Sequence, residues 1–518
     1  MSASKKKKAR QELAEQEHSK PQETQKAPHS DKLYAVVGIL CLALVVLVLA
    51  WNTGIIQRNA AAVTVNGVKY TVADAQYYYN STKQSVQNFY YSNLGMLPFD
   101  GSVSTKDQVY DSETGETWYD YLLGQTLDTM ATYDAIEAKA KSEGYTMSAE
   151  SKEFLDSQLA ELQSAADNGG FKDADAYVKA IYGTYLTYDR FAQLFEKSVF
   201  VSDYINSVTT GFTYADSDYQ AYYEENADAL DNYTITQFVF RASVPTTDDN
   251  GNAIERTEDE EKAALEQAKA EAKAKAEDIM ARLEKGEDAA DLAEEYSEDL
   301  YSYDISDVRT GSLVNTSYTD WAFDPARRNG DLTLAEYDGS GSYFYYVARF
   351  EDRERDDTPT ANVRHILVAA DTDEGAAQPT EAQYAEAKKK AEELLAQWKA
   401  GEATEESFAE LAAANSADGG SAADGGLIPN ITAESGYIQD FTDWSMDPSR
   451  KEGDTGLVKN TGSATKGWHV MYYVASGDPV WKMSADSVLR SEDYAVWEEA
   501  VCEGYAAKSG IGLKFLQP

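Results

Sequence analysis

The sequence of 518 residues contains little cysteine and little histidine, and its acidic residues far outnumber its basic ones. Cys41 lies inside an apolar run, which leaves Cys502 without a partner and excludes a disulfide framework or a cysteine-based zinc site. Lys and Arg number 46 against 89 Asp and Glu, a formal net charge of −43. So acidic a surface repels phosphate backbones, which excludes nucleic-acid binding as the main role. The sequence also has neither a phosphate-cradling Gly–Lys loop nor a serine nucleophile elbow, and we expect no cofactor and no metal.

An apolar segment near the N-terminus predicts a membrane anchor. Residues 33–51 carry no charge and the run continues weakly to Ile56, and about 20 such residues cross a bilayer as a helix. The tail before it, 1–32, has eight Lys and Arg against five Asp and Glu, and basic residues stay on the cytoplasmic side. We therefore expect a single-pass anchor at 33–56, a cytoplasmic tail and an extracytoplasmic chain beyond it. A cleaved signal peptide is the alternative, although its apolar part usually runs only about 7–15 residues.

Residues 62–228 read as a mostly helical region that opens with a β-hairpin. Asn66-Gly67 stands between two alternating apolar stretches, which is typical of a tight hairpin turn. Thr71, followed by Asp74, then predicts the start of a helix. The tyrosine clusters of this region, such as 77–79, would suit a peptide-binding surface, but such spacing more often reflects helix packing with hydroxyls that reach water.

An internal repeat predicts two modules of similar fold. The segment AEAKAKAEDIMARLEKGE from residue 270 returns as AEAKKKAEELLAQWKAGE from residue 385, and DWAFDP returns later as DWSMDP. The modules occupy roughly 230–354 and 360–479, as expected for one fold copied with small changes in its loops.

Each module has the same predicted order of elements. An alternating strand precedes a long helix, whose start is marked by a capping box, Thr257 with Glu260 in one copy and Thr380 with Gln383 in the other. A shorter helix, a glycine-rich loop and a β-rich stretch follow, which indicates an α+β module with an antiparallel sheet. The last segment, 480–518, reads as an amphipathic helix.

Two of the four histidines lie in the second module, and the first module has none. His365 belongs to the opening strand of the second module and His469 to its closing strand. Strands at the two ends of a module that pair in a small sheet place two side chains on one face. A single strand histidine is more often a half-buried residue without a role, but a pair in one copy alone indicates a site.

Several ordered motifs of the second module together resemble the parvulin-type peptidyl-prolyl isomerase domain. The resemblance spans 361–478 and is carried by His365-Ile-Leu-Val, Phe408-Ala-Glu-Leu-Ala, Ser416-Ala-Asp418, Gly425-Gly426, Phe441 and Gly467-Trp-His469. The layout of the whole chain is similar to that of the extracytoplasmic PrsA/SurA-type foldases. The resemblance implies a multidomain protein with a transmembrane helix, a mostly α-helical SurA-like N-terminal region and two α+β parvulin-like modules, the first degenerate. It also implies a C-terminal helix that packs back against the N-terminal helices.

The resemblance also assigns roles to particular residues. It implies that His365, Asp418 and His469 form the catalytic hydrogen-bond network. It implies that Phe441 walls the proline pocket, with Tyr437 where the family usually has Met and Ile428 at an apolar pocket position. The sequence departs from the family at Gly425-Gly-Leu-Ile-Pro429, where the usual motif is Gly-Gly-Asp-Leu-Gly, and this difference concerns the shape of the pocket more than the type of reaction.

The first module keeps the scaffold and loses these residues. Gln237 stands where His365 would be, and Ser342 or Tyr343 where His469 would be, so that Asp299 alone survives. We expect this module to be structural or to bind peptide.

The expected function is that of a membrane-anchored foldase that isomerises X–Pro bonds in exported proteins and holds unfolded clients. A non-catalytic holdase, in which both modules only bind peptide, is the alternative from another class, and a surface adhesion protein explains the repeat but not the histidines. The partners expected are unfolded or partly folded exported polypeptides with X–Pro bonds and the membrane. A homodimer is compatible with the sequence.

Overall fold

The computed structural model describes residues 39–40, 42–46, 48–49, 53–247, 252–309, 317–339, 342–373, 376, 378–462 and 465–517. The chain divides into two compact units, one made of Met1–Phe212 with Tyr494–Pro518 and the other of Thr213–Asp493. The expected multidomain organisation with small antiparallel sheets is confirmed.

The predicted tail, 1–32, lies outside the described residues, and the predicted anchor is described only in part. Among the residues that the structure describes, no helix has both the length and the apolar character that a membrane crossing requires.

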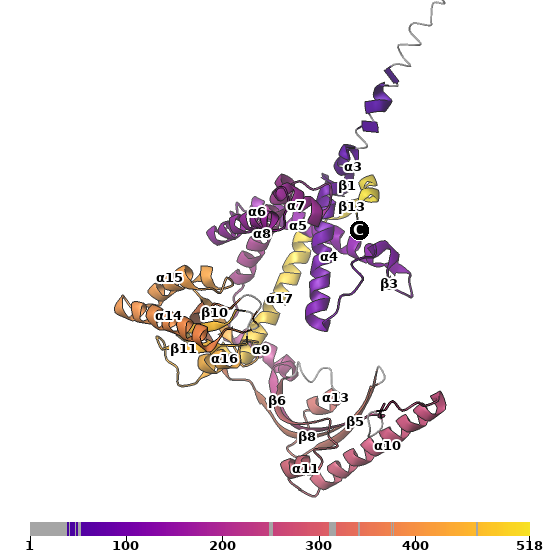
Figure 1. Ribbon diagram of the computed structural model, residues 1–518, viewed down its shortest axis with the longest axis vertical. Helices are drawn as coiled ribbons and strands as arrows, with labels where there is room; N and C mark the ends of the chain where they lie inside the picture. Colours follow the sequence, from indigo (N-terminus) through magenta and orange to yellow (C-terminus); the bar gives the residue numbers. More distant parts are fainter. Residues whose placement is uncertain are drawn as a thin grey trace, which may run out of the picture. The chain divides into compact units, whose positions relative to one another are not determined.

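The first unit is mainly helical; in Figure 1 its N-terminal part is drawn in indigo to magenta and its C-terminal part in yellow. A hairpin precedes a series of helices, and the C-terminus adds a third strand. The elements are α3 (Ile55–Asn59), β1 (Ala61–Val65), β2 (Val68–Thr71), α4 (Val72–Leu94), η1 (Thr105–Asp107), β3 (Val109–Asp111), β4 (Glu116–Thr117), α5 (Trp118–Ser142), α6 (Ala149–Asn168), α7 (Ala174–Tyr182), α8 (Tyr188–Gly211), β13 (Ala507–Ser509) and η4 (Ile511–Phe515).

Local sequence signals explain how this unit begins. Asn66 and Gly67 adopt positive φ angles of 42° and 86°, which the tight turn between β1 and β2 requires. Thr71 and Asp74 form the predicted capping box of α4. The tyrosines 77–79 are buried in the core of the unit, so the packing interpretation of that cluster is confirmed.

The C-terminal segment returns to the N-terminal helical region, as expected. β13 pairs with β1 in the sheet β13-β1-β2, with Val63 opposite Ser509. Near the end of α17 (Val480–Cys502), the ring of Trp497 lies 6.0 Å from that of Tyr204 in α8.

The second unit contains α9 (Asp216–Asn226), η2 (Ala227–Ala229) and two modules with the same succession of elements. The first module consists of β5 (Asp231–Ala242), α10 (Glu258–Leu283), α11 (Ala289–Glu295), β6 (Ser302–Arg309), α13 (Thr319–Phe323), β7 (Leu332–Gly339) and β8 (Ser342–Arg355). The second consists of β9 (Pro359–Ala369), α14 (Glu381–Ala400), α15 (Glu405–Asn415), η3 (Ala422–Asp424), β10 (Leu427–Ile431), α16 (Gln439–Met446), β11 (Thr455–Asn460) and β12 (Gly467–Pro479).

The two sheets have equivalent strand orders, β6-β5-β8-β7 and β10-β9-β12-β11, and all their neighbouring strands are antiparallel. The long helices α10 and α14 each open with the predicted capping box. Each long helix packs against the two central strands of its own sheet, as Figure 1 shows for α10.

In the second module, the alternation of side chains along β9 separates two small cores. Ile366 and Val368 point toward α14 and α15, where Phe408 fills the centre of the first core. Val363 belongs to the opposite face, where Phe441 from α16 packs in the second core. His365 has the same parity as Val363, and this places its imidazole on the face that α16 covers.

Candidate active site

The two histidines of the second module come from the two central strands of its sheet. In the antiparallel register of β9 and β12, His365 lies opposite Met471, and His469 lies opposite Leu367. The histidines are therefore diagonal neighbours on one face of the sheet. Both side chains are buried, with 4% and 7% of their surface exposed, and their ring centroids are 5.0 Å apart.

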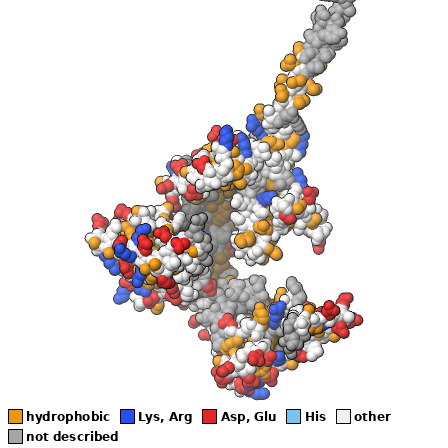
Figure 2. Space-filling model, viewed as in Figure 1, with side chains coloured by type: hydrophobic (Ala, Val, Ile, Leu, Met, Phe, Trp, Pro, Cys, Tyr) orange, Lys and Arg blue, Asp and Glu red, His pale blue; other side chains and the backbone are white. Residues whose placement is uncertain are grey.

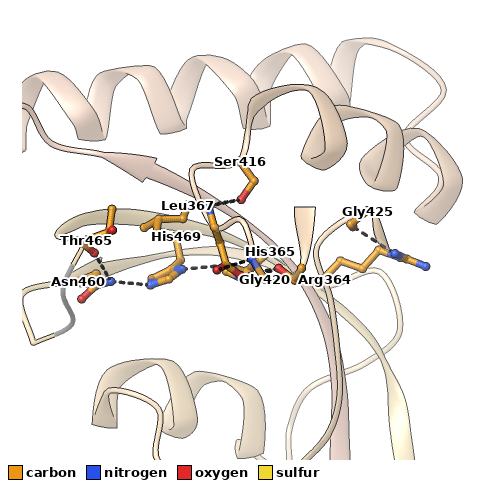
Figure 3. A network of polar contacts seen from close by, with 11 residues as sticks. Arg364, His365, Leu367, Ser416, Gly420, Gly425, Asn460, Thr465 and His469 are labelled. Atoms are coloured by element: carbon orange, nitrogen blue, oxygen red, sulfur yellow. Dashed lines mark hydrogen bonds and ion pairs between the residues drawn. The ribbon is translucent and has the colours of Figure 1, made fainter. Parts of the chain in front are cut away.

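A continuous chain of hydrogen bonds links the two imidazoles to polar groups on either side (Figure 3). His365 Nδ1 and His469 Nδ1 are 2.9 Å apart, and His365 Nε2 is 3.0 Å from Oδ2 of Asp418. At the other end, Asn460 Nδ2 is 3.1 Å from His469 Nε2. Ser421 donates its hydroxyl hydrogen to Asp418 Oδ2 over 2.6 Å.

The partners at the two ends of this chain fix where each proton lies. Asn460 Nδ2 also donates to the carbonyl of Thr465, so it is the amide NH₂ group that faces His469, and His469 Nε2 accepts. His469 must then donate from Nδ1 to His365 Nδ1, and His365 donates from Nε2 to the carboxylate of Asp418. Both imidazoles are thus neutral, each with a defined tautomer.

The electrostatic environment supports this proton arrangement. The hydrogen bond from His365, and then that from Ser421, hold the pKa of Asp418 far below its usual range. Burial, and then the neighbouring His365 ring, lower the pKa of His469 to about 3, against the effect of the Asp418 carboxylate. The network therefore carries one fixed negative charge, at Asp418, beside a neutral imidazole at His469.

A pocket of about 270 Å³ lies directly beside this network. All six residues predicted from the sequence line it: His365, Asp418, Ile428, Tyr437, Phe441 and His469. The Phe441 ring stands edge-on to both imidazoles, with centroid separations of 5.5 Å to His365 and 5.1 Å to His469. Tyr437 continues the aromatic wall 5.2 Å from Phe441, and its side chain is partly exposed at 44%.

The loop that carries Asp418 is held against β9 by hydrogen bonds to the backbone of that strand. Ala417 N–H donates to the carbonyl of Leu367, and the Leu367 N–H donates to Ser416 Oγ. Gly426 accepts from His365 N–H and has a φ of +72°, and a Cβ at this position would lie 2.1 Å from the carbonyl oxygen of His365. Glycine is therefore required where the loop passes this close to the strand.

Other residues of the site were not found from the sequence. Asn460 and Ser421 belong to the hydrogen-bond chain, and Leu367, Gly436, Ile438 and Gly462 complete the lining of the pocket. Ser421 follows Asp418 by three residues within a glycine-rich loop, which is a weak signal. Asn460 is brought to His469 by the hairpin of β11 and β12, a contact that residue spacing alone does not reveal.

Comparison with known protein families identifies this arrangement. The family model of the PPIC-type PPIase domain matches residues 251–322 and 345–473, and the second range contains all six predicted residues of the pocket. The second module is a parvulin-type peptidyl-prolyl isomerase domain. A search of curated proteins gave no match.

Three solved structures are similar to parts of the chain. A peptidylprolyl isomerase (PrsA) from Bacillus anthracis shares 19% identity, with 29% of this chain and 58% of that chain covered and a TM-score of 0.18. A PrsA from Bacillus cereus shares 15% identity over 64% of this chain and 92% of that chain, with a TM-score of 0.18. Foldase protein PrsA from Streptococcus pneumoniae shares 12% identity over 76% of this chain and 91% of that chain, with a TM-score of 0.23.

The strand register revises the equivalence between the first module and the isomerase domain. His469 lies opposite Leu367, and the matching pair in the first module is Val239 with Tyr346. The expectation that Ser342 or Tyr343 occupies the position of His469 is therefore wrong. The alignment of β8 with β12 by sequence differs from the alignment that their pairing with β5 and β9 gives.

The surviving aspartate of the first module does not occupy the position of Asp418. In the second module, Ala417 N–H donates to the carbonyl of Leu367 in the first strand, and in the first module Tyr301 N–H makes the equivalent bond to Val239. Tyr301 therefore matches Ala417, and Ser302 matches Asp418. Asp299 lies before this point and pairs with Lys275 of α10 at 2.7 Å. The segment from the end of α11 at Glu295 to Tyr301 is longer than that from the end of α15 at Asn415 to Ala417, and this explains why the sequence match at Asp299 was misleading.

The polar contact made by Gln237, at the position of His365, differs in kind from the imidazole chain. Gln237 accepts a hydrogen bond from the hydroxyl of Tyr318, over 3.0 Å. Tyr318 matches Phe441 in the repeat and is almost fully buried, with 3% exposed, and its ring lies 6.2 Å from that of Tyr346. Aromatic rings and one amide therefore take the place of the imidazole chain in the first module.

Proposed function

We propose that this protein is a membrane-anchored extracytoplasmic foldase. Its isomerase domain catalyses cis–trans isomerisation of X–Pro bonds in exported proteins, while other parts of the chain hold unfolded clients. The observation that carries the proposal is the neutral imidazole chain of His365 and His469, ending on the Asp418 carboxylate, at the side of an aromatic pocket of about 270 Å³.

The reaction requires rotation about a bond with partial double-bond character. The barrier is about 18–20 kcal/mol because amide resonance must be lost, and isomerisation at X–Pro therefore takes tens of seconds or more without a catalyst. No bond is made or broken, so neither a nucleophile nor a metal is needed. A catalyst has to bind the twisted imide better than either planar form.

The pocket offers two means of doing so. Phe441, Tyr437 and Ile428 form an apolar cup that grips the proline ring and excludes water while the imide turns. All ring nitrogens of His365 and His469 are engaged in the hydrogen-bond chain. We therefore infer that the two imidazoles form a rigid, neutral side of the pocket and fix the position of the Asp418 charge beside it. A fixed carboxylate disfavours the charge-separated resonance form of a planar imide whose carbonyl oxygen faces it.

The sequence supports the anchoring and the location. The charge-free segment 33–51 has the length of a membrane span, and the basic tail before it favours a cytoplasmic N-terminus. Protease treatment of intact cells tests this orientation. Extracellular protease should remove the isomerase domain and leave the tail, and a fully protected chain would contradict the proposed location.

Exchange spectroscopy by NMR on a short X–Pro peptide tests the catalytic role. The wild-type chain should accelerate exchange, and His365→Ala and His469→Ala should each lose most of that acceleration. Gln237→Ala and Tyr346→Ala are matched controls, because they alter the equivalent positions of the first module and should leave the rate unchanged. Equal exchange rates in the wild type and the two histidine variants would leave only the holdase alternative.

A further inference from the structure

The end of α4 and the segment that follows it form an exposed apolar surface in the first unit. Eight large apolar side chains within 22 residues are between 39% and 65% exposed. We call this surface the α4 tip, and it consists of Phe89, Tyr91, Leu94, Met96, Leu97, Val103, Val109 and Tyr110. Figure 2 shows hydrophobic side chains gathered at this end of α4.

Packed aromatic rings lie beneath the α4 tip. Trp118, the first residue of α5, is buried, and its ring lies 5.1 Å from Phe99 and 4.8 Å from Tyr110. Tyr110 also stacks on Tyr121 with centroids 4.2 Å apart. Because these rings anchor the hairpin of β3 and β4 to α5, the apolar side chains above them are presented on an ordered support.

Charges in the segment that follows α4 are almost all negative, and Lys83 of α4 has its Nζ 5.7 Å from the centre of the Phe99 ring. The segment 100–116 carries five carboxylates, Asp100, Asp107, Asp111, Glu113 and Glu116, against a single basic residue, Lys106. Lys106 is engaged elsewhere, since its Nζ lies 4.3 Å from the centre of the Tyr119 ring. An apolar surface with an acidic border attracts an apolar segment that carries basic residues at its ends.

We propose that the α4 tip binds segments of unfolded client chains in which a run of apolar residues is flanked by lysine or arginine. This proposal rests on the proposed role of the protein in holding clients, and it names the surface and the chemistry of the segment held. The binding needs no proline, so it is separate from the pocket of the isomerase domain.

Fluorescence anisotropy with a proline-free peptide tests the proposal. The peptide has a centre of Leu, Phe and Val flanked by lysines, and a second peptide carries glutamates in their place. The full-length chain should bind the lysine peptide more tightly. Leu94→Ser with Leu97→Ser should weaken that binding roughly tenfold or more, because two exposed anchors for apolar burial are lost.

A matched control is the double variant Ile181→Ser and Val496→Ser. These side chains are comparably exposed in the same unit but belong to α7 and α17. The control should bind the lysine peptide as the wild type does. Asp107→Asn with Glu113→Gln should reduce the preference for the lysine peptide over the glutamate peptide, whereas an unchanged preference would overturn the charge argument.

Further measurements separate this proposal from others. The Leu94 and Leu97 variant should retain wild-type exchange of a short X–Pro peptide, and a wild type without exchange would refute the proposed isomerase while leaving the peptide assay interpretable. If sedimentation shows that the variant only loses a dimer and peptide binding is unaffected, the α4 tip is an interface between copies and the proposal fails. Binding of phosphatidylcholine–phosphatidylglycerol vesicles by the α4 tip, without binding of the peptide, would equally overturn it.

Discussion

Asn460→Asp is expected to add a second proton to the imidazole of His469. In the wild type, the Asn460 amide donates to His469 Nε2 and thereby fixes both imidazole tautomers. An aspartate of nearly the same shape can only accept, so His469 must present Nε2–H to it. The His469 ring would then satisfy both neighbours only by carrying protons on both nitrogens, with Nδ1–H still donating to His365.

The expected magnitude follows from the pKa of His469. Burial holds it at about 3 in the wild type, whereas the ordinary value is about 6.5. A return to 6.5 in Asn460→Asp corresponds to roughly 5 kcal/mol of relative stabilisation of the imidazolium, at about 1.36 kcal/mol for each pKa unit. A carboxylate in direct contact with a buried imidazole is capable of an effect of this order.

Imidazole ¹⁵N NMR spectra across pH 4 to 8 measure the result. Wild-type His469 should stay neutral throughout, and His469 of Asn460→Asp should titrate near or above pH 6.5. Peptide exchange by this variant should change over the same pH interval. The control Asn460→Leu removes the donor without adding an acceptor, and its His469 should remain neutral. A neutral His469 at pH 5 in Asn460→Asp would refute the tautomer assignment.

Other predictions concern the stability of the isomerase domain. His469 has a lowered pKa in the folded state, so the unfolded state takes up its proton first as the pH falls below about 6.5. The free energy of unfolding should therefore decrease between pH 6.5 and about pH 3, by at most roughly 5 kcal/mol. The lowered pKa of Asp418 adds a further loss of stability below about pH 4. Hydrogen exchange of the β9 amides measures this pH dependence, and His469→Gln should abolish the part of the loss that occurs above pH 4. Gly426→Ala should disrupt the pairing of the loop with β9 and abolish the acceleration of peptide exchange. Gly453→Ala is the control, since Gly453 also has a positive φ but open space around its Cβ, and it should lower the free energy of unfolding by only about 1–2 kcal/mol. Comparable losses for the two variants in urea unfolding would contradict this. Phe408→Ala should destabilise the domain by about 3–5 kcal/mol, since this ring is fully buried between Trp398 and Tyr472, and a loss below about 1 kcal/mol in the same assay would contradict the packing described.

Much of the site was predictable because the relevant signals are ordered along the chain. The capping boxes at Thr257 and Thr380 and the alternation around His365 predicted the elements, since caps and periodicity are local properties. The resemblance to the parvulin family predicted that the six residues lie together in space. The spacing of His365, Asp418 and His469 along the chain does not by itself indicate this arrangement.

The parts that escaped prediction depend on pairing between distant segments. Asn460 reaches His469 through the register of β11 and β12, and the register was not available from the sequence. The same reason explains the error at the first module, where Tyr346 rather than Ser342 matches His469. A shift of four residues leaves the alternation of a strand unchanged, so the pattern of apolar residues could not detect it.

The proposed function requires that the pocket of the isomerase domain bind the X–Pro bond whose rotation it accelerates. Titration of the methyl-labelled full-length chain with an Ala–Pro peptide, followed by NMR, measures both events in one sample. The methyl signals of Ile428 and Leu367 should shift with the same half-saturation concentration as the acceleration of exchange. Acceleration without any change at these methyls, or with changes confined to the first module, would contradict it.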